Sequence, residues 1–423
     1  MKKLLLLYIL FALFALSVAL CVITARHTYS SNGVKPTGEI LSRAFADAKN
    51  DNADGDGADK DADIDDSVDE LLKHLNLGDV QGIVDLLNAD QLAVFGFGDI
   101  YKRVQAVASG EFKSDFSGVL SYVFALFGAD VFEFLPMLLA VLSITLAYNL
   151  INSVKGKYAS ESIERVVYFA TGAIAISLVV GYFSSVLAHA VRYIVSLKTQ
   201  INAVAPVLLT LMTAAGATSS AVAYTPTIAL LDGGMTNIVT YIAFPALLMA
   251  LVFDVIGSIA TAIKLGKTAD FFRSACKWLL GTAFFLFIAV IGVTGITASV
   301  RDGITVRAAR FAVSKYVPVI GGYLSQGFDF IMAGNVLIKN ALGSSAVLLV
   351  ILLVAPIISK LVIFTLTLNL TAAIAEPLGG ERFCGILSSV SKSSSMISTV
   401  VIAMTFLYIM FLSMIICTGN IGL

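Results

Sequence analysis

Residues 395–417 read SMISTVVIAMTFLYIMFLSMIIC, a run of 23 residues without Asp, Glu, Lys or Arg. About 20 apolar residues are enough for a helix to cross the hydrocarbon core of a bilayer. The rest of the chain has the same character, since 58% of its 423 residues are hydrophobic and 13% are charged, against about 25% charged in soluble domains. The formal net charge of −1 gives no indication of nucleic-acid binding. The composition therefore predicts an all-α, polytopic membrane protein.

Other apolar windows long enough to span a bilayer precede this one. They lie at about 132–152, 166–190, 236–262, 277–299 and 343–375. Together with interrupted segments, these windows predict about 6–8 transmembrane or re-entrant helices. The 343–375 window contains a proline and a lysine, so it is either a kinked span or two shorter segments.

A further window, at about 201–224, contains the run TAAGATSSAVAY (213–224), in which nearly all residues are small. Small residues insert weakly into lipid but allow helix backbones to approach closely. The run is consistent with a tightly packed central helix, or with a re-entrant or broken helix that lines a cavity. The candidate helix-packing or pore residues are Gly216, Ser219 and Ser220. The cations around residues 155–165 favour a cytoplasmic location for the loop that contains them. The topology after residue 200 then depends on which of the two alternatives for the 201–224 window holds.

The N-terminal region has the composition of an exported segment. Residues 1–25 begin with two lysines and a long apolar run, which predicts a signal peptide or an uncleaved anchor. Residues 26–66 are expected to be a disordered acidic linker, because residues 47–66 are rich in Asp, Gly and Ala and almost free of bulky apolar side chains. A calcium loop at 52–63 is the alternative, but the sequence lacks flanking amphipathic helices. Residues 67–130 are expected to form extracytoplasmic amphipathic helices that lead into a helical membrane domain at 131–423.

The segment at 300–340 combines cations with apolar residues. Residues 306–317 place apolar side chains on one arc of a helix and most polar ones on the other. This pattern predicts an amphipathic helix in the membrane interface, with its cations against lipid phosphates or a partner's acidic groups. The candidate contact residues are Arg301, Arg307, Arg310 and Lys315.

Three charged residues lie within or at the end of apolar windows: Asp254, Lys360 and Glu376. Charges in such positions either stabilise helix packing or belong to an ion or proton path. No GxxxxGK[ST], GxSxG or HExxH motif occurs, and the three histidines are scattered. The sequence therefore predicts no catalytic, cofactor or metal site.

Several motifs together resemble the stage III sporulation protein AE family of endospore-forming bacteria. They are FSGVLSYVFALF (116–127), FPALLMAL (244–251), VRDGITVRAARFAVSKYVPVIGG (300–322), IKNALG (338–343) and AAIAEPLGG (372–380). The resemblance covers about residues 110–423 and carries no catalytic residue.

The resemblance implies a non-enzymatic component of the channel between mother cell and forespore, in the mother-cell-derived outer forespore membrane. The implied partners are the other A-operon proteins, including a separate ATPase and ring-forming proteins, and the forespore protein Q. The residues alone leave a second function open, a stand-alone secondary transporter (permease) for a small solute. Broken segments near 201–234 and 343–377 are compatible with that function.

Overall fold

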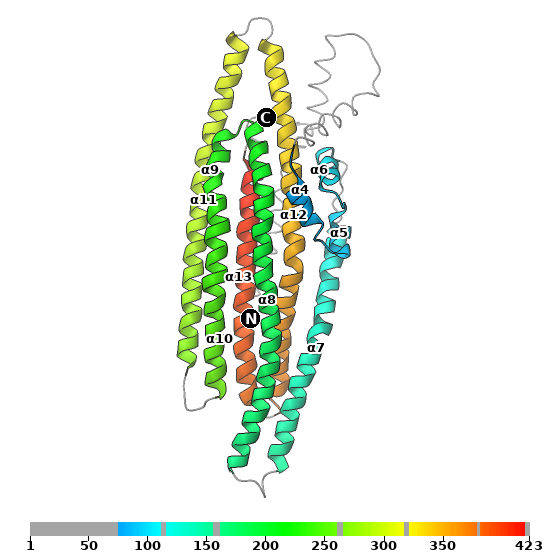
Figure 1. Cartoon of the computed structure of the whole chain (residues 1–423), viewed down its shortest axis with the longest axis vertical. Helices are drawn as coiled ribbons and strands as arrows, with labels where there is room; N and C mark the ends of the chain where they lie inside the picture. Colours follow the sequence, from blue (N-terminus) through cyan, green and yellow to red (C-terminus); the bar gives the residue numbers. More distant parts are fainter. Residues whose placement is uncertain are drawn as a thin grey trace.

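A computed structural model describes residues 75–110, 116–154, 161–259, 265–316, 321–378 and 381–418. Within these ranges all regular elements are helices and none is a strand (Figure 1). Six helical stretches are long and apolar enough to cross a membrane: Gly118–Ile151, Phe169–Ala214, Thr218–Gly257, Gly266–Ala308, Ile331–Ala375 and Phe383–Cys417. The all-α, polytopic fold class is confirmed.

The long helices run side by side along the long axis of the molecule, and successive stretches alternate in direction (Figure 1). Their bounds are α7 (Phe116–Val154), α8 (Glu161–Ala214), α9 (Thr218–Ala229), α10 (Phe244–Ile259), α11 (Gly266–Tyr316), α12 (Gly321–Ala375) and α13 (Glu381–Cys417). At 55 residues, α12 is about 80 Å long if straight, whereas the hydrocarbon core of a bilayer is about 30 Å thick. The longest helices therefore extend beyond a membrane.

The window at 201–224 is neither a separate span nor a continuous central helix. α8 ends at Ala214, and α9 begins at Thr218 in the opposite direction (Figure 1). Gly216, in the connection, has a φ of 83°, a left-handed conformation that glycine adopts without steric cost. The broken-helix alternative agrees better with the structure, but the break is a reversal of chain direction between two spans. The end of α10 consequently lies at the same end of the bundle as the end of α7.

The third span changes its helical geometry part-way along its length. Two π-helical turns, η2 (Leu230–Met235) and η3 (Ile238–Ala243), separate α9 from α10. The Thr236 hydroxyl, between these turns, donates to the carbonyl of Leu231 at 3.1 Å and lies 3.1 Å from the Tyr408 hydroxyl of α13. π-helical turns inside α-helices occur frequently at functional sites.

In the described residues before α7, three short helices precede the bundle and pack against it. They are α4 (Gly78–Val84), α5 (Ala89–Phe95) and α6 (Ile100–Ala108). Gln91 Nε2 donates to the Leu352 carbonyl at 2.9 Å, and Arg103 Nε donates to Ser345 Oγ at 3.1 Å, so both reach α12. Burial lowers the pKa of the Arg103 guanidinium to about 10, which leaves it charged at neutral pH. These helices share the core of the bundle instead of forming a separate module.

Two expected boundaries are absent from the helices. α7 runs without interruption through residues 130 and 131, where the membrane domain was expected to begin. α11 likewise continues from its apolar part to Tyr316, so residues 300–316 are not a separate interfacial helix. The expected signal peptide at 1–25 and acidic linker at 26–66 lie outside the described residues.

Candidate functional site at the reversal between α8 and α9

The reversal between α8 and α9 is held by a carboxylate from α11. The two oxygens of Asp302 accept hydrogen bonds from the backbone N–H groups of Ser219 at 2.8 Å and Ser220 at 2.9 Å. Asp302 is only 5% exposed. The residue at the N-cap of α9, Ala217, has no side chain that can accept a hydrogen bond, so Asp302 supplies the cap from another helix. Its negative charge also complements the positive end of the α9 dipole.

Gly216 is the point of closest packing at this reversal. A Cβ atom at this position would lie 3.0 Å from Cγ2 of Val306 on α11 and 3.1 Å from Cε of Met332 on α12. A larger residue would therefore meet two neighbouring helices as well as an unfavourable backbone conformation. Gly216, Ser219 and Ser220, grouped by the sequence, share this site in the structure, whereas Asp302 was not among the expected residues.

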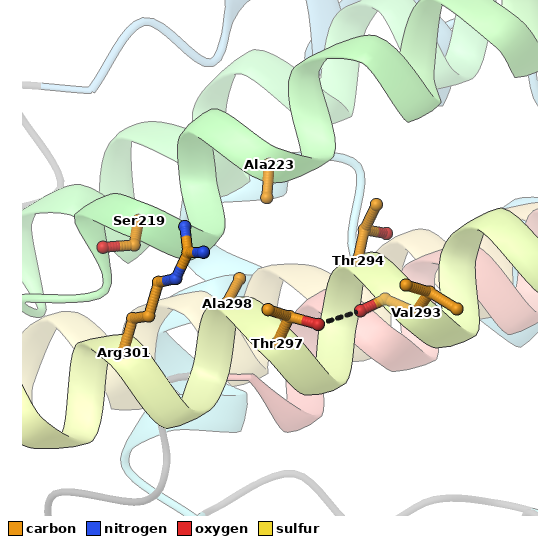
Figure 2. Close-up of a pocket in the computed structure, with 7 residues that line it drawn as sticks. All are labelled: Ser219, Ala223, Val293, Thr294, Thr297, Ala298 and Arg301. Atoms are coloured by element: carbon orange, nitrogen blue, oxygen red, sulfur yellow. Dashed lines mark hydrogen bonds between the residues drawn. The ribbon is translucent and has the colours of Figure 1, made fainter.

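An open cleft of about 260 Å³ lies beside the reversal, between α9 and α11 (Figure 2). It is lined by Ser219, Ala223, Val293, Thr294, Thr297, Ala298 and Arg301. Both threonine hydroxyls donate to carbonyls of their own helix, Thr294 to Val290 at 2.8 Å and Thr297 to Val293 at 2.7 Å. Since ligand pockets usually measure about 300–1,000 Å³, the cleft is small for a substrate site.

The candidate cations are distributed along the last part of α11. Arg301 lines the cleft near Ser219, and Arg307 is exposed. Arg310 and Lys315 also belong to α11, although their side chains lie outside the described part of the chain. The structure thus brings one cation, Arg301, to the reversal. The others lie further along the helix, toward its end.

Asp254 is part of a buried ion pair. Its carboxylate accepts a hydrogen bond from the guanidinium of Arg273, which is 7% exposed and joins α10 to α11. Arg273 also lies 3.3 Å from Asp270 Oδ1 and 3.5 Å from Ser393 Oγ. This arrangement matches a packing role for Asp254, because buried charges are stable only when they are paired and hydrogen-bonded.

The other two expected intramembrane charges take part in different contacts. Lys360 Nζ of α12 donates to Glu133 Oε1 of α7 at 2.8 Å. Glu376 lies in the turn after α12, where its backbone N–H donates to the Ala372 carbonyl at 3.0 Å. These contacts are separate from the ion pair of Asp254.

Lys339 and Asp232 are among the charged residues of the spans that were not anticipated from the sequence. Lys339 has no exposed surface, and its Nζ donates to the carbonyl of Thr418 at the end of α13. Asp232, in η2, lies 3.4 Å from Lys198 Nζ and accepts a hydrogen bond from Asn202 Nδ2 at 3.1 Å. In the ranges that the structure describes, no group of three or more His, Cys, Asp or Glu side chains could hold a metal ion.

The part of the chain from α6 to α13 matches a known protein family. A family model described as stage III sporulation protein AE matches residues 99–419. The chain belongs to this family. Stage III sporulation protein AE of Bacillus subtilis (strain 168) is 25% identical over 278 residues, which cover 66% of this chain and 70% of that protein. No solved structure matches the chain.

Membership of the stage III sporulation protein AE family supports a role in sporulation. The six candidate spans further identify an integral membrane protein. Neither matched description names an enzymatic activity. The match begins at Asp99, at the start of α6, slightly before the region in which the motifs were recognised.

Proposed function

We propose that the chain is a non-enzymatic component of a channel or secretion complex that links the mother cell and the forespore. Its place is the mother-cell-derived outer forespore membrane. Its partners are the other stage III sporulation A-operon proteins, including a separate ATPase and ring-forming proteins, together with the forespore protein Q. The observation that supports this proposal best is the family match across six membrane-crossing stretches.

The end of the hairpin formed by α11 and α12 is the proposed contact with these partners. Val306 and Met332 are level with Gly216 at the α8–α9 reversal, and α11 continues for ten residues beyond Val306. At 1.5 Å per residue, the hairpin extends about 15 Å past the reversal. This extension is visible as the yellow helices that pass the end of α8 in Figure 1. It includes Arg307 and Arg310, which can pair with acidic groups of a partner or with lipid phosphates.

Replacing both Arg307 and Arg310 by Glu tests this contact. We expect the double variant to insert normally but to lose co-purifying membrane proteins when it is isolated from sporulating cells. Because the contact is electrostatic, forespore gene expression at late stages should fail together with co-purification. Replacing both residues by Lys is the matched control and should retain partners. Wild-type partner recovery in the Glu variant would remove the hairpin end from the proposed interface.

A stand-alone secondary transporter is the second candidate. The π-helical interruption of the third span favours it, since transporters commonly bind solutes at interrupted helices. Mass spectrometry of the complex purified from sporulating cells separates the two candidates. Recovery of the A-operon proteins and protein Q supports a channel component, whereas recovery of the chain alone in an active form supports a transporter.

A further inference from the structure

One face of α8 carries a polar stripe along the C-terminal half of the helix. Its exposed members recur at intervals of three or four residues and are polar except for Pro206: Arg192, Ser196, Thr199, Asn202, Pro206, Thr210 and Thr213. Val195, 48% exposed, is an apolar residue on the same face. From first to last the stripe covers about 32 Å, which matches the thickness of the hydrocarbon core of a bilayer. This part of α8 lies within the stretch Phe169–Ala214, long and apolar enough to span a membrane.

Charged groups make this face unsuitable for contact with lipid. Asp232 of η2 lies beside the stripe and contacts Lys198 and Asn202 at 3.4 and 3.1 Å. The side chains of Lys198 and Asp232 are 39% and 24% exposed, and Arg192 is exposed as well. Charged residues within membrane spans nearly always face a protein interior or a water-filled space, because burying them in lipid is costly.

The hydroxyl groups alone would not support the same conclusion. Ser196 Oγ donates to the Arg192 carbonyl at 3.0 Å, and Thr199 Oγ1 donates to the Val195 carbonyl at 3.2 Å. Hydroxyls that bond to their own helix in this way are tolerated in a membrane. The ion pair and Arg192, not the serines and threonines, therefore carry the argument for water.

Apolar side chains of α11 are exposed at the same height of the bundle. The hydroxyl of Tyr224 lies against Gly295, where a Cβ atom would be only 2.8 Å away. Asp232 is eight residues further along the third span, or about 12 Å. Nine and ten residues back from Gly295 along the antiparallel helix α11, at about 14–15 Å, lie Leu286 and Phe285, which are 56% and 70% exposed.

We propose that the α8 stripe faces water at a depth of the membrane where α11 faces lipid. The chain then contributes one wall of an aqueous path, and the polar stripe supplies the surface along which hydrophilic cargo or ions pass. The proposal of an aqueous path rests on the proposed function, because the stripe lies on the outside of the bundle and the path needs a second wall. The remainder of the channel complex supplies the opposite wall.

Cysteine accessibility in membranes of sporulating cells tests the proposal. In a chain whose native cysteines are replaced by alanine, single cysteines are placed at Ser196, Thr199 and Asn202 on the stripe, and at Phe285 and Leu286 on α11. Each variant is treated with a charged, membrane-impermeant methanethiosulfonate and, separately, with a lipid-soluble maleimide. We expect the stripe positions to react with the charged reagent at least tenfold faster than the α11 positions. The α11 positions should react slowly with both reagents, because a thiol surrounded by lipid does not ionise, and should react with the maleimide once the bilayer is dissolved in detergent.

Two outcomes would overturn the proposal. Equal reaction of both sets with the charged reagent would place this height outside the bilayer, where a polar stripe is only a solvated helix face. Failure of the stripe positions to react with the charged reagent would mean that lipid or protein covers them. Ser196→Cys and Thr199→Cys are conservative because these hydroxyls bond only to their own helix. Co-purification of partners, measured on the same samples, tests the proposed function separately.

Discussion

Asp302 provides the sharpest test of how the third span is positioned. Replacing it by Ala removes both acceptors from the N–H groups of Ser219 and Ser220 at the buried start of α9. Loss of an N-cap costs about 0.5–2 kcal/mol, and a hydrogen bond to a charged group contributes about 1.5–3 kcal/mol. Because Asp302 makes two such bonds while 5% exposed, we expect a loss of about 3 kcal/mol. That loss corresponds to roughly a hundredfold in the folding equilibrium.

The assay is thermal unfolding of the detergent-purified protein, combined with limited proteolysis by elastase, which cleaves after small residues. Asp302→Ala should lower the melting temperature and open the connection between Ala214 and Thr218 to cleavage. Asp302→Asn, which keeps one acceptor, should be intermediate. Ser219→Ala is the matched control, since it leaves both backbone donors in place. If Asp302→Ala and Ser219→Ala were equally stable and equally resistant, Asp302 would not be the cap that holds the reversal.

Three further changes test a close packing contact, a buried ion pair and a more exposed ion pair. Each is measured as a shift in melting temperature. Gly216→Leu should cost about 1–3 kcal/mol through overpacking while Leu208→Ile is tolerated; equal tolerance would show that the reversal can expand. Arg273→Ala should cost about 3–5 kcal/mol because it removes the guanidinium that pairs with Asp254 in a buried site, and a variant in which both residues become Leu should recover part of the loss; a double variant as unstable as Arg273→Ala would refute the pairing. Glu133→Gln removes the charge of the carboxylate that pairs with Lys360 and is 46% exposed, and it should cost less than about 1 kcal/mol. A loss as large as that of Arg273→Ala would contradict the expectation that the buried pair contributes more than the exposed one.

The spans were predictable because each requires only a long run without charges. Residues 395–417 lie within α13, the most buried of the candidate spans. The reversal at Gly216 was harder to recognise. A turn in water is usually marked by Gly, Pro, Asn or Asp, whereas the residues around Gly216 are Ala, Thr and Ser, the small residues that are also typical of a packed membrane helix. The sequence grouped Gly216, Ser219 and Ser220, which lie together at the reversal, but it did not indicate the direction of the chain after them.

The residue that holds the reversal could not be assigned from the sequence. Asp302 and Ser219 are 83 residues apart, and no local pattern relates them. The same holds for Lys360 and Glu133, which pair although they are 227 residues apart. Amphipathic patterning at residues 300–316 indicated a helix correctly, but it could not show that the helix continues from the span before it.

The contacts of α5 and α6 have a consequence for the biogenesis of the protein. Arg103 and its partner Ser345 are separated by 242 residues, and Gln91 and Leu352 by 261. At a synthesis rate of about 5–20 residues per second, α12 follows these helices by roughly 12–50 s. During that interval Arg103 has no native acceptor on α12. The nascent chain therefore needs water, a chaperone or the translocon to accommodate these helices until α12 has entered the bundle.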